Sequence, residues 1–234
     1  AKNETEFSSL QMDLHTKKSE LSSLESQLSF FNELLEQKEG YPEGAKKILT
    51  NQSEYEGLIG PVGELFQIDS KYEMAFQSAL DSWVECLVVK DKSSAMKILS
   101  SAKAKNLGNF SILPLKELKK FKTKKSSIPK VEGILGRALD LCGVSKLNAN
   151  LADALLGNLL IVEDINKIQS KTVGDQWDLV DLNGAYVGKN MLLKYQNKSK
   201  ETSIIGRQEK VQAIQKQIKS LEKEIDKNEA KYIS

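Results

Sequence analysis

Apolar side chains recur every seven residues along the first 38 positions of the chain. Proline and glycine are absent from this segment until Gly40. Sustained heptad spacing predicts a coiled-coil helix, because the repeated positions fall on one face. We therefore expect segment 1–38 to be a helical arm. Its seam positions are Phe7, Leu14, Leu21, Leu28 and Leu35, with Leu10, Lys17, Leu24 and Phe31 following the first four by three residues.

The C-terminal segment 204–234 has the same pattern. A helix with one apolar stripe needs a partner in water, and the simplest arrangement pairs the two segments in an intramolecular antiparallel coiled coil. The alternative is that each segment pairs with another molecule. Because Ala1 and Ser234 fall in mid-heptad, we expect the arms to continue in a longer protein. The C-terminal seam positions are Ile204, Val211, Ile218, Ile225 and Tyr232, with Ile214, Leu221 and Asn228 between them.

The heptads vanish in the middle of the chain, where all 4 prolines lie. Apolar runs of strand length alternate there with helical patterns, which predicts a globular α/β (α+β) unit. The Asn183-Gly184 pair signals a turn. The expected helices are 71–80, 91–104, 151–156 and a short one over 163–168, and the expected strands are 84–89, 110–113, 159–162 and 177–182.

One ten-residue pattern occurs twice in this middle region. Residues 57–66 read GLIGPVGELF, and residues 133–142, which lie 76 positions later, read GILGRALDLC. A helical stretch and then an apolar run follow each copy, so we expect two related α/β subdomains. Their predicted bounds are 39–115 and 131–203, joined by a basic linker over 116–130.

The paired glycines of the repeat are a candidate phosphate loop, but the surrounding sequence argues against it. Pro61 follows Gly60 and Arg137 follows Gly136, whereas a phosphate loop requires GxxxxGK with Ser or Thr next. Neither GK[ST] nor GxGxxG occurs in the chain. We therefore interpret the glycines as positions of positive φ and close backbone packing.

Composition excludes several kinds of chemistry. The chain has 1 His, His15, on the polar N-terminal arm, so a histidine-based triad or metal cluster is not expected. Cys86 and Cys142 lie in apolar runs and are expected to be buried free thiols rather than a disulfide or metal site. No transmembrane run or signal peptide is evident. We expect a cytoplasmic protein.

Two carboxylate pairs, Glu163 with Asp164 and Asp178 with Asp181, invite comparison with acid–base catalysis. Glu163 and Asp164 are better explained as the first turn of a helix, where acidic residues are favourable. No nucleophile motif or phosphate loop accompanies either pair. We expect no catalytic residues, no metal and no cofactor in this chain.

Lysines are concentrated between residues 101 and 130, where Glu117 stands as the one acid among them. A basic surface of this kind can neutralise phosphates without reading a base sequence. The alternative is a solvated linker. The candidate DNA-binding residues are Lys103, Lys105, Lys119, Lys120, Lys122, Lys124 and Lys125, together with Lys198, Lys200 and Arg207 near the return into the C-terminal arm.

The order of these features resembles the hinge domain of SMC (structural maintenance of chromosomes) proteins, and most of all its bacterial branch. The resemblance covers nearly the whole chain. It is carried by FNELLEQKEGYPEGAKKIL at the entry, by GLIGPVGELFQIDSKYEMAFQSALDSWVECLVV in the first half, by GILGRALDLC, LADALLGNLLIVEDI and DLVDLNGAYV in the second half, and by IIGRQEKVQAIQKQI at the return.

This resemblance implies a non-catalytic module that dimerises through strands of its two subdomains, forming a two-fold ring that joins two arms. It implies a parent protein with an ATPase head, absent here, that acts in chromosome condensation and segregation at the nucleoid. Kleisin and accessory subunits would bind at that head, and DNA would bind weakly near the hinge. The alternative is a hinge-like DNA-binding module of another SMC-related repair or organisation protein.

The chain departs from the family near the implied dimer contact. Family members carry a run of paired glycines after the turn, whereas this chain reads GKNMLLKYQNKSKE from Gly188 onward. The segment MLLKY, 191–195, still has the alternation of a strand, with Met191 and Leu193 on one side and Leu192 and Lys194 on the other. The candidate interface residues are Gly184, Gly188, Met191, Leu192, Leu193 and Tyr195.

Overall fold

The computed structural model describes residues 2–120, 126–168, 173–189, 192–195 and 203–233, and the helix side chains at its two ends from residue 8 and up to residue 230. The chain divides into two compact units. One consists of residues 1–39 with 207–234, and the other of residues 40–206. None of the described helices is both long and apolar enough to cross a membrane.

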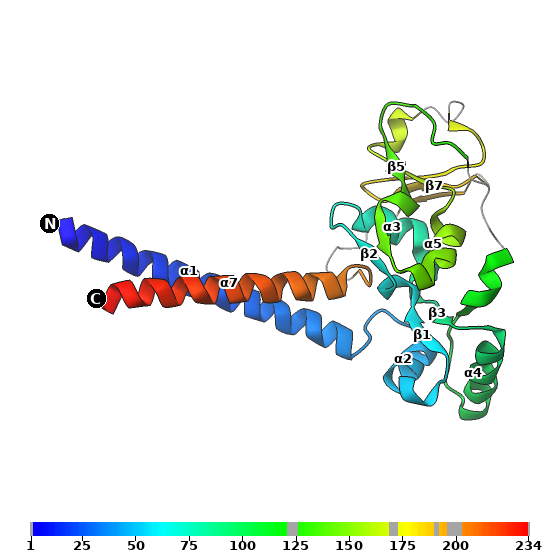
Figure 1. Ribbon diagram of the computed structural model, residues 1–234, viewed down its shortest axis with the longest axis horizontal. Coiled ribbons are helices and arrows are strands. Elements are labelled where there is room, and N and C mark those ends of the chain that lie inside the picture. Colours follow the sequence, from blue (N-terminus) through cyan, green and yellow to red (C-terminus); the bar gives the residue numbers. More distant parts are fainter. Residues whose placement is uncertain (1, 121–125, 169–172, 190–191, 196–202, 234) are drawn as a thin grey trace. The chain divides into compact units, whose positions relative to one another are not determined.

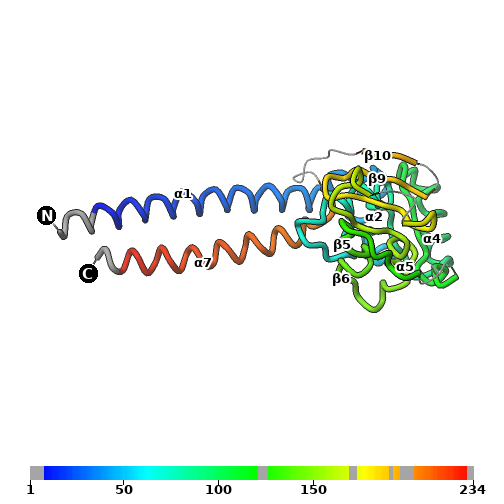
Figure 2. The backbone as a smooth tube through the Cα atoms, turned by 90° about the horizontal axis from the view of Figure 1, so that it is seen from above, coloured from blue at the N-terminus to red at the C-terminus, as the bar shows by residue number. Residues whose placement is uncertain are grey.

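The first unit is a pair of antiparallel helices, α1 (Lys2–Glu36) and α7 (Arg207–Ile233), which run side by side in Figures 1 and 2. Their seam contains two apolar clusters. Leu14 packs with Leu221 and Ile225, and the second cluster joins Phe31 to Ile214 and Ile218. These are heptad positions, so the predicted intramolecular antiparallel coiled coil is confirmed. The seam positions Phe7 and Tyr232 lie outside the described side chains.

The C-terminal heptad pattern begins at Ile204, whereas the helix α7 begins at Arg207. Ile204 and Ile205 precede α7 and belong to the core of the globular unit, where they are 6% and 0% exposed. Ser203 Oγ donates to Gln77 Oε1 at 2.8 Å, which holds the chain against α3 (Glu73–Leu80). Isoleucine suits both a coiled-coil seam and a globular core, so the spacing alone did not separate the two.

The duplicated motif forms the same structure twice in the globular unit. The first copy contains β1 (Leu58–Pro61), a 3-10 turn and β2 (Phe66–Ile68). The second contains β5 (Ile134–Arg137), a 3-10 turn and β6 (Cys142–Val144), each element 76 positions later. Gly60 and Gly136 have φ values of +149° and +154°, and the strand register shifts beside each. The interpretation of these glycines as positive-φ positions is confirmed.

The remaining elements agree with the predicted order and differ at their ends. The predicted strand 84–89 is too long, because residues up to Glu85 form a 3-10 helix over Asp81–Glu85. Asp81 has φ +47°, a turn conformation that apolar patterning does not reveal. The other elements are α2 (Glu43–Thr50), β3 (Leu87–Val89), α4 (Lys92–Lys105), β4 (Ile112–Pro114), α5 (Ala149–Leu156), β7 (Leu159–Val162), β8 (Asp178–Asp181), β9 (Ala185–Val187) and β10 (Leu193–Tyr195).

The strands form three sheets. The first half builds a three-stranded sheet in the order β1-β3-β4, and the second half builds a five-stranded sheet in the order β10-β9-β8-β7-β5. The third sheet pairs β2 with β6, so that Phe66 lies opposite Val144 and Ile68 opposite Cys142. Because β2 and β6 come from the two copies of the motif, this antiparallel pair joins the two halves.

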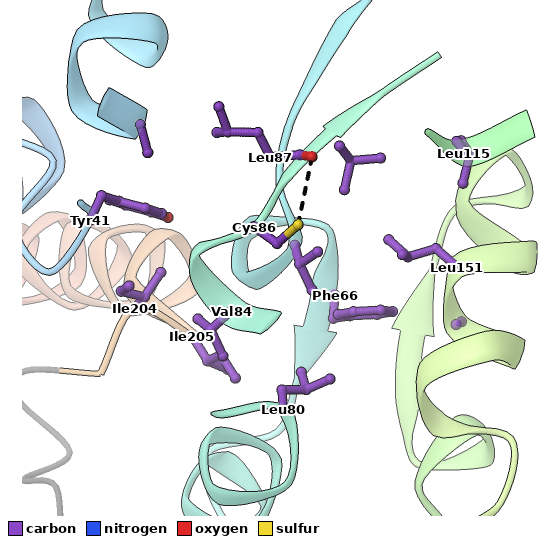
Figure 3. Packing of buried hydrophobic residues seen from close by; sticks show 14 of the residues in the cluster. Tyr41, Phe66, Leu80, Val84, Cys86, Leu87, Leu115, Leu151, Ile204 and Ile205 are labelled. Carbon is purple, nitrogen blue, oxygen red and sulfur yellow. Dashed lines mark hydrogen bonds between the residues drawn. The ribbon is translucent and has the colours of Figure 1, made fainter. Parts of the chain in front are cut away.

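A single apolar core extends across both halves. It contains Phe66, Leu80 and Leu87 from the first half and Leu151 from the second, with Ile205 reaching it from the C-terminal side (Figure 3). A smaller cluster covers the other face of the five-stranded sheet, where Leu160, Val162 and Leu179 pack with Trp177. Apolar residues thus cover both faces of β7, which explains its continuous apolar sequence.

Candidate functional site

The five-stranded sheet ends at β10, whose outer edge pairs with no other strand in the part of the chain that the structure describes. β10 pairs antiparallel with β9, with Leu193 opposite Val187 and Tyr195 opposite Ala185. Leu193 and Tyr195 are 70% and 68% exposed, and the preceding Leu192 is 54% exposed. An exposed apolar edge strand presents unpaired N–H and C=O groups that a strand of another chain can bind.

Lys194 fixes β10 to the rest of the unit from the opposite side of the strand. Its Nζ lies 3.3 Å from Asp81 Oδ2 and 3.3 Å from the carbonyl oxygen of Ser78. The same ammonium lies 4.6 Å from the centre of the Tyr186 ring, which is its cross-strand neighbour on β9. Lys194 therefore links an edge strand of the second half to the end of α3 in the first half.

Tyr186 lies between this lysine and Asp178 on β8. Burial raises the pKa of the Tyr186 hydroxyl to about 12, and the nearby Asp178 carboxylate adds to the shift. The Tyr186 hydroxyl therefore stays protonated at neutral pH, next to Lys194 of β10. Asp178 Oδ1 also accepts a hydrogen bond from the backbone N–H of Lys189 at 2.7 Å, which positions the connection that leaves β9.

The turn between β8 and β9 is built around Asn183 and Gly184, as the sequence predicts. Asp181 Oδ1 accepts from the N–H of Asn183 at 2.9 Å and of Ala185 at 3.0 Å, and Gly184 has φ +85°. The carbonyl oxygen of Gly184 accepts from Ser78 Oγ at 2.7 Å. This turn therefore forms a second link between the sheet and α3.

Gly184 and Gly188 are both buried within the unit. The N–H of Gly188 donates to the carbonyl oxygen of Leu192 at 2.8 Å, closing the connection between β9 and β10. A Cβ at Gly188 would lie 3.1 Å from Cε1 of Tyr186. In this structure the two glycines therefore shape the edge, whereas Leu192, Leu193 and Tyr195 present side chains on it. Met191 lies outside the described residues.

A second sheet edge lies in the first half, at β4. It pairs in parallel with β3, and its other side is unpaired in the described part of the chain. Pro114 ends the strand, and proline is tolerated at an edge because it offers no N–H to a neighbour. β4 is therefore a second sheet edge, besides β10, on which an added strand can pair, and β1 and β5 are the opposite end strands of the two sheets.

The lysines singled out from the sequence fall into three groups. Lys103, Lys119 and Lys120 are exposed. Lys105 Nζ lies 2.8 Å from Glu54 Oε2, and Arg207 is buried with Nη1 donating to the carbonyl oxygen of Glu39 at 2.7 Å. The others, Lys122, Lys124, Lys125, Lys198 and Lys200, lie outside the described residues.

The two cysteines are free thiols. Cys86 is buried and Cys142 half-buried, and burial raises the pKa of each thiol to about 11. The expectation of free thiols is therefore confirmed, with Cys142 more accessible than predicted. Among the described residues, no group of three or more His, Cys, Asp or Glu side chains is placed to hold a metal ion.

Sequence reasoning missed the residues that support β10. Asp81 and Lys194 are far apart in the chain, and periodicity carries no signal for a contact between them. Tyr186 could have been singled out as an aromatic residue in the predicted strand after the Asn183-Gly184 turn. Its role depends on the cross-strand pairing with Lys194, which only the sheet register reveals.

Comparison with known proteins finds that the chain is similar to one family. The model of the "SMC proteins Flexible Hinge Domain" matches residues 55–167. The Chromosome partition protein Smc of Halothermothrix orenii is 27% identical over 84% of this chain and 17% of its own length. The Bacillus subtilis protein of the same name is 26% identical over 78% of this chain and 16% of its own. The chain thus spans about a sixth of these relatives.

Solved structures of SMC hinge domains are similar to this chain in fold. An asymmetric dimer of the Geobacillus stearothermophilus SMC hinge domain matches with a TM-score of 0.81 at 20% identity, over 98% of this chain and 95% of that one. The Pyrococcus furiosus SMC protein hinge domain matches with a TM-score of 0.56 at 22% identity, over 75% of this chain and 90% of that one.

Proposed function

We propose that the chain is an SMC hinge, a homodimerisation module that joins two coiled-coil arms for chromosome condensation and segregation. The hinge domain is a non-catalytic part of SMC proteins. The observation that carries the proposal is the apolar free edge of β10, with Leu193 and Tyr195 exposed and Lys194 fixing the strand from behind. A strand with one unpaired side is suited to β-addition.

The sheet edges at β10 and β4 can together serve a symmetric pair of chains. We propose that β10 of one protomer pairs beside β4 of its partner, and that the two-fold axis repeats this contact. An isologous arrangement of this kind closes with two copies and leaves neither edge exposed. The similar hinge from Geobacillus stearothermophilus is an asymmetric dimer, which supports association through this fold.

Sedimentation equilibrium tests the proposal. The wild-type chain should be dimeric at tens of micromolar. Leu193→Lys with Tyr195→Lys should weaken the dimer by at least about tenfold, because charges on an edge strand oppose pairing. The control is Met96→Lys with Leu99→Lys, an exposed apolar pair on α4. A monomeric wild type, or equal weakening by the two double variants, would contradict the proposal.

We propose weak DNA binding as a second function, supported by the exposed Lys103, Lys119 and Lys120. Binding should be independent of base sequence and should fall steeply with salt, because it rests on phosphate neutralisation. Charge reversal of Lys119, Lys120, Lys124 and Lys125 should reduce both the affinity and its salt dependence in fluorescence anisotropy. Unchanged affinity would exclude this surface.

The wider context follows from the relatives. We propose that the chain is part of a longer SMC protein whose head is an ATPase that binds kleisin and accessory subunits, acting at the nucleoid in the cytoplasm. The curated relatives named Chromosome partition protein Smc support this, since this chain matches about a sixth of their length. ATP hydrolysis by the full-length protein, and its absence in this chain, would test it.

A further inference from the structure

A cleft with a volume of about 650 Å³ lies between the two halves of the globular unit, away from β10. Four stretches line it: the start of β1, Lys90 just after β3, the 3-10 helix Leu115–Lys120 that follows β4, and the segment 146–150 that leads into α5. We call it the lysine-lined cleft. It is defined by four leucine and isoleucine side chains and four lysines, which are named below.

The wall of the lysine-lined cleft is largely apolar. Leu58, Ile59, Leu115 and Leu147 contribute to it, and Leu115 is buried while Leu147 is 66% exposed. The exposed Leu147 side chain has apolar surface that a ligand in the cleft can cover. The volume lies within the range of small-molecule sites, which are mostly apolar with a few polar groups.

The charged residues of the lysine-lined cleft are all positive. Lys90, Lys116, Lys119 and Lys146 line it and no carboxylate does. Among the described residues, none of the four makes an ion pair within 4.0 Å. The nearby Asp91 Oδ1 accepts hydrogen bonds from the N–H and the hydroxyl of Ser94 at 2.9 and 3.0 Å. These bonds, and to a smaller extent the charges of Lys90 and Lys116, hold the pKa of the Asp91 carboxyl below its ordinary value, so this carboxylate offsets part of the positive charge.

The backbone holds two of these lysines side by side. The N–H of Lys90 donates to the carbonyl oxygen of Gly57 at 2.8 Å, and the N–H of Lys116 donates to the carbonyl oxygen of Lys90 at 3.1 Å. Both lysine stems therefore start from fixed positions at the sheet end. The four exposed ammonium groups give the opening of the cleft a positive potential, which favours the approach of an anion.

We propose that the lysine-lined cleft binds a small amphipathic anion. Its apolar body lies against Leu58, Ile59, Leu115 and Leu147, and its phosphate or carboxylate group accepts hydrogen bonds from the lysine ammonium groups. Lysine presents three donors on a flexible stem and suits either group. A ligand in this position contacts both halves of the repeat, so binding also stabilises the folded unit.

The test uses the complete chain and 1-anilinonaphthalene-8-sulfonate, a fluorescent amphipathic anion, as the probe. The probe should bind saturably at one site per chain. Octyl phosphate and octanoate should displace it at concentrations at least about tenfold lower than octanol or inorganic phosphate, because only they combine both contacts. Comparison of octyl phosphate with octanoate then distinguishes a phosphate ligand from a carboxylate.

Variants assign the binding to the lysine-lined cleft. Lys90→Gln, Lys116→Gln and Lys146→Gln together should weaken octyl phosphate binding by at least about tenfold. The matched control replaces Lys103, Lys130 and Lys189, three exposed lysines outside the cleft, in the same way. Leu147→Ser, at an exposed position, should weaken octyl phosphate but leave inorganic phosphate unchanged.

Equal affinity in the two triple variants, no saturable binding by the wild type, or equal displacement by inorganic phosphate and octyl phosphate would each overturn the proposal. The inference does not rest on dimerisation. The cleft includes no residue of β10 or β4, although Leu115 and Lys116 follow β4 directly, so the cleft variants are also sedimented and should be dimeric as the wild type is. Failure of one proposal is therefore distinguishable from failure of the other.

Discussion

The ammonium group of Lys17 on α1 lies 2.6 Å from Oε2 of Glu224 on α7. Lys17 stands at a seam position of the N-terminal arm, where the other seam positions are apolar. The hydrogen bond from Lys17 holds the pKa of Glu224 below its ordinary value, and the same bond raises the pKa of Lys17. Glu224 precedes Ile225, which packs with Leu14. The ion pair between Lys17 and Glu224 therefore favours the helix register in which Leu14 packs with Ile225.

We expect that reversing one charge of the Lys17–Glu224 pair destabilises the coiled coil and that reversing both charges restores much of the stability. Lys17→Glu alone should lower the thermal midpoint of the helical signal at 222 nm, and adding Glu224→Lys should restore much of it. The control is the pair Lys18 and Glu229, also 2.6 Å apart but with Lys18 56% exposed against 21% for Lys17. Solvent weakens exposed pairs, so its coupling should be smaller. Additive effects at Lys17 and Glu224 would contradict this.

The two repeat glycines offer a matched comparison of backbone strain and steric contact. At Gly60 an added Cβ would lie 3.8 Å from Leu65 Cδ2, whereas at Gly136 it would lie 3.2 Å from Leu141 Cδ1. Gly60→Ala should therefore cost the strain of positive φ alone, about 1–3 kcal/mol of unfolding free energy. Gly136→Ala should cost more. Urea unfolding measures both, and a larger loss for Gly60→Ala would be inconsistent with this geometry.

Tyr186 should make stability depend on alkaline pH. Its pKa is about 12 in the folded protein, against about 10 for an unfolded tyrosine. Because the folded-state pKa is raised, its contribution is complete below pH 10 and is lost as the pH rises to about 12. Urea midpoints of the wild type should fall relative to those of Tyr186→Phe across this window. A constant difference would show that Tyr186 titrates normally.

The thiols should be poorly reactive while the chain is folded. Since burial raises the pKa of both Cys86 and Cys142 to about 11, little thiolate is present at pH 8. We expect slow modification by 5,5′-dithiobis(2-nitrobenzoate), slowest at the buried Cys86, and rapid modification of both in urea. Single Cys→Ser variants assign the two rates. Rapid reaction of Cys86 in the folded protein would mean that this part of the core opens.

Local patterns were sufficient where the structure itself is local or repetitive. The heptads located both arms and, because two apolar stripes must cover each other, their pairing. The 76-residue repeat predicted two similar halves, and the glycines in it predicted positive φ. The continuous apolar run of β7 and the turn at Asn183 and Gly184 also followed from composition and spacing.

The tertiary structure decided which elements meet. No periodicity specifies that β2 pairs with β6, that β10 is an edge, or that Lys194 reaches Asp81. Nor does it specify that Lys90, Lys116 and Lys146 surround one cleft. Hydrophobic spacing reports which face of an element is buried, whereas register and partner depend on contacts between residues far apart in the chain. Spacing along the chain thus predicted the two arms and the duplicated unit, whereas strand pairing within the second half made β10 an edge and packing between the halves formed the cleft.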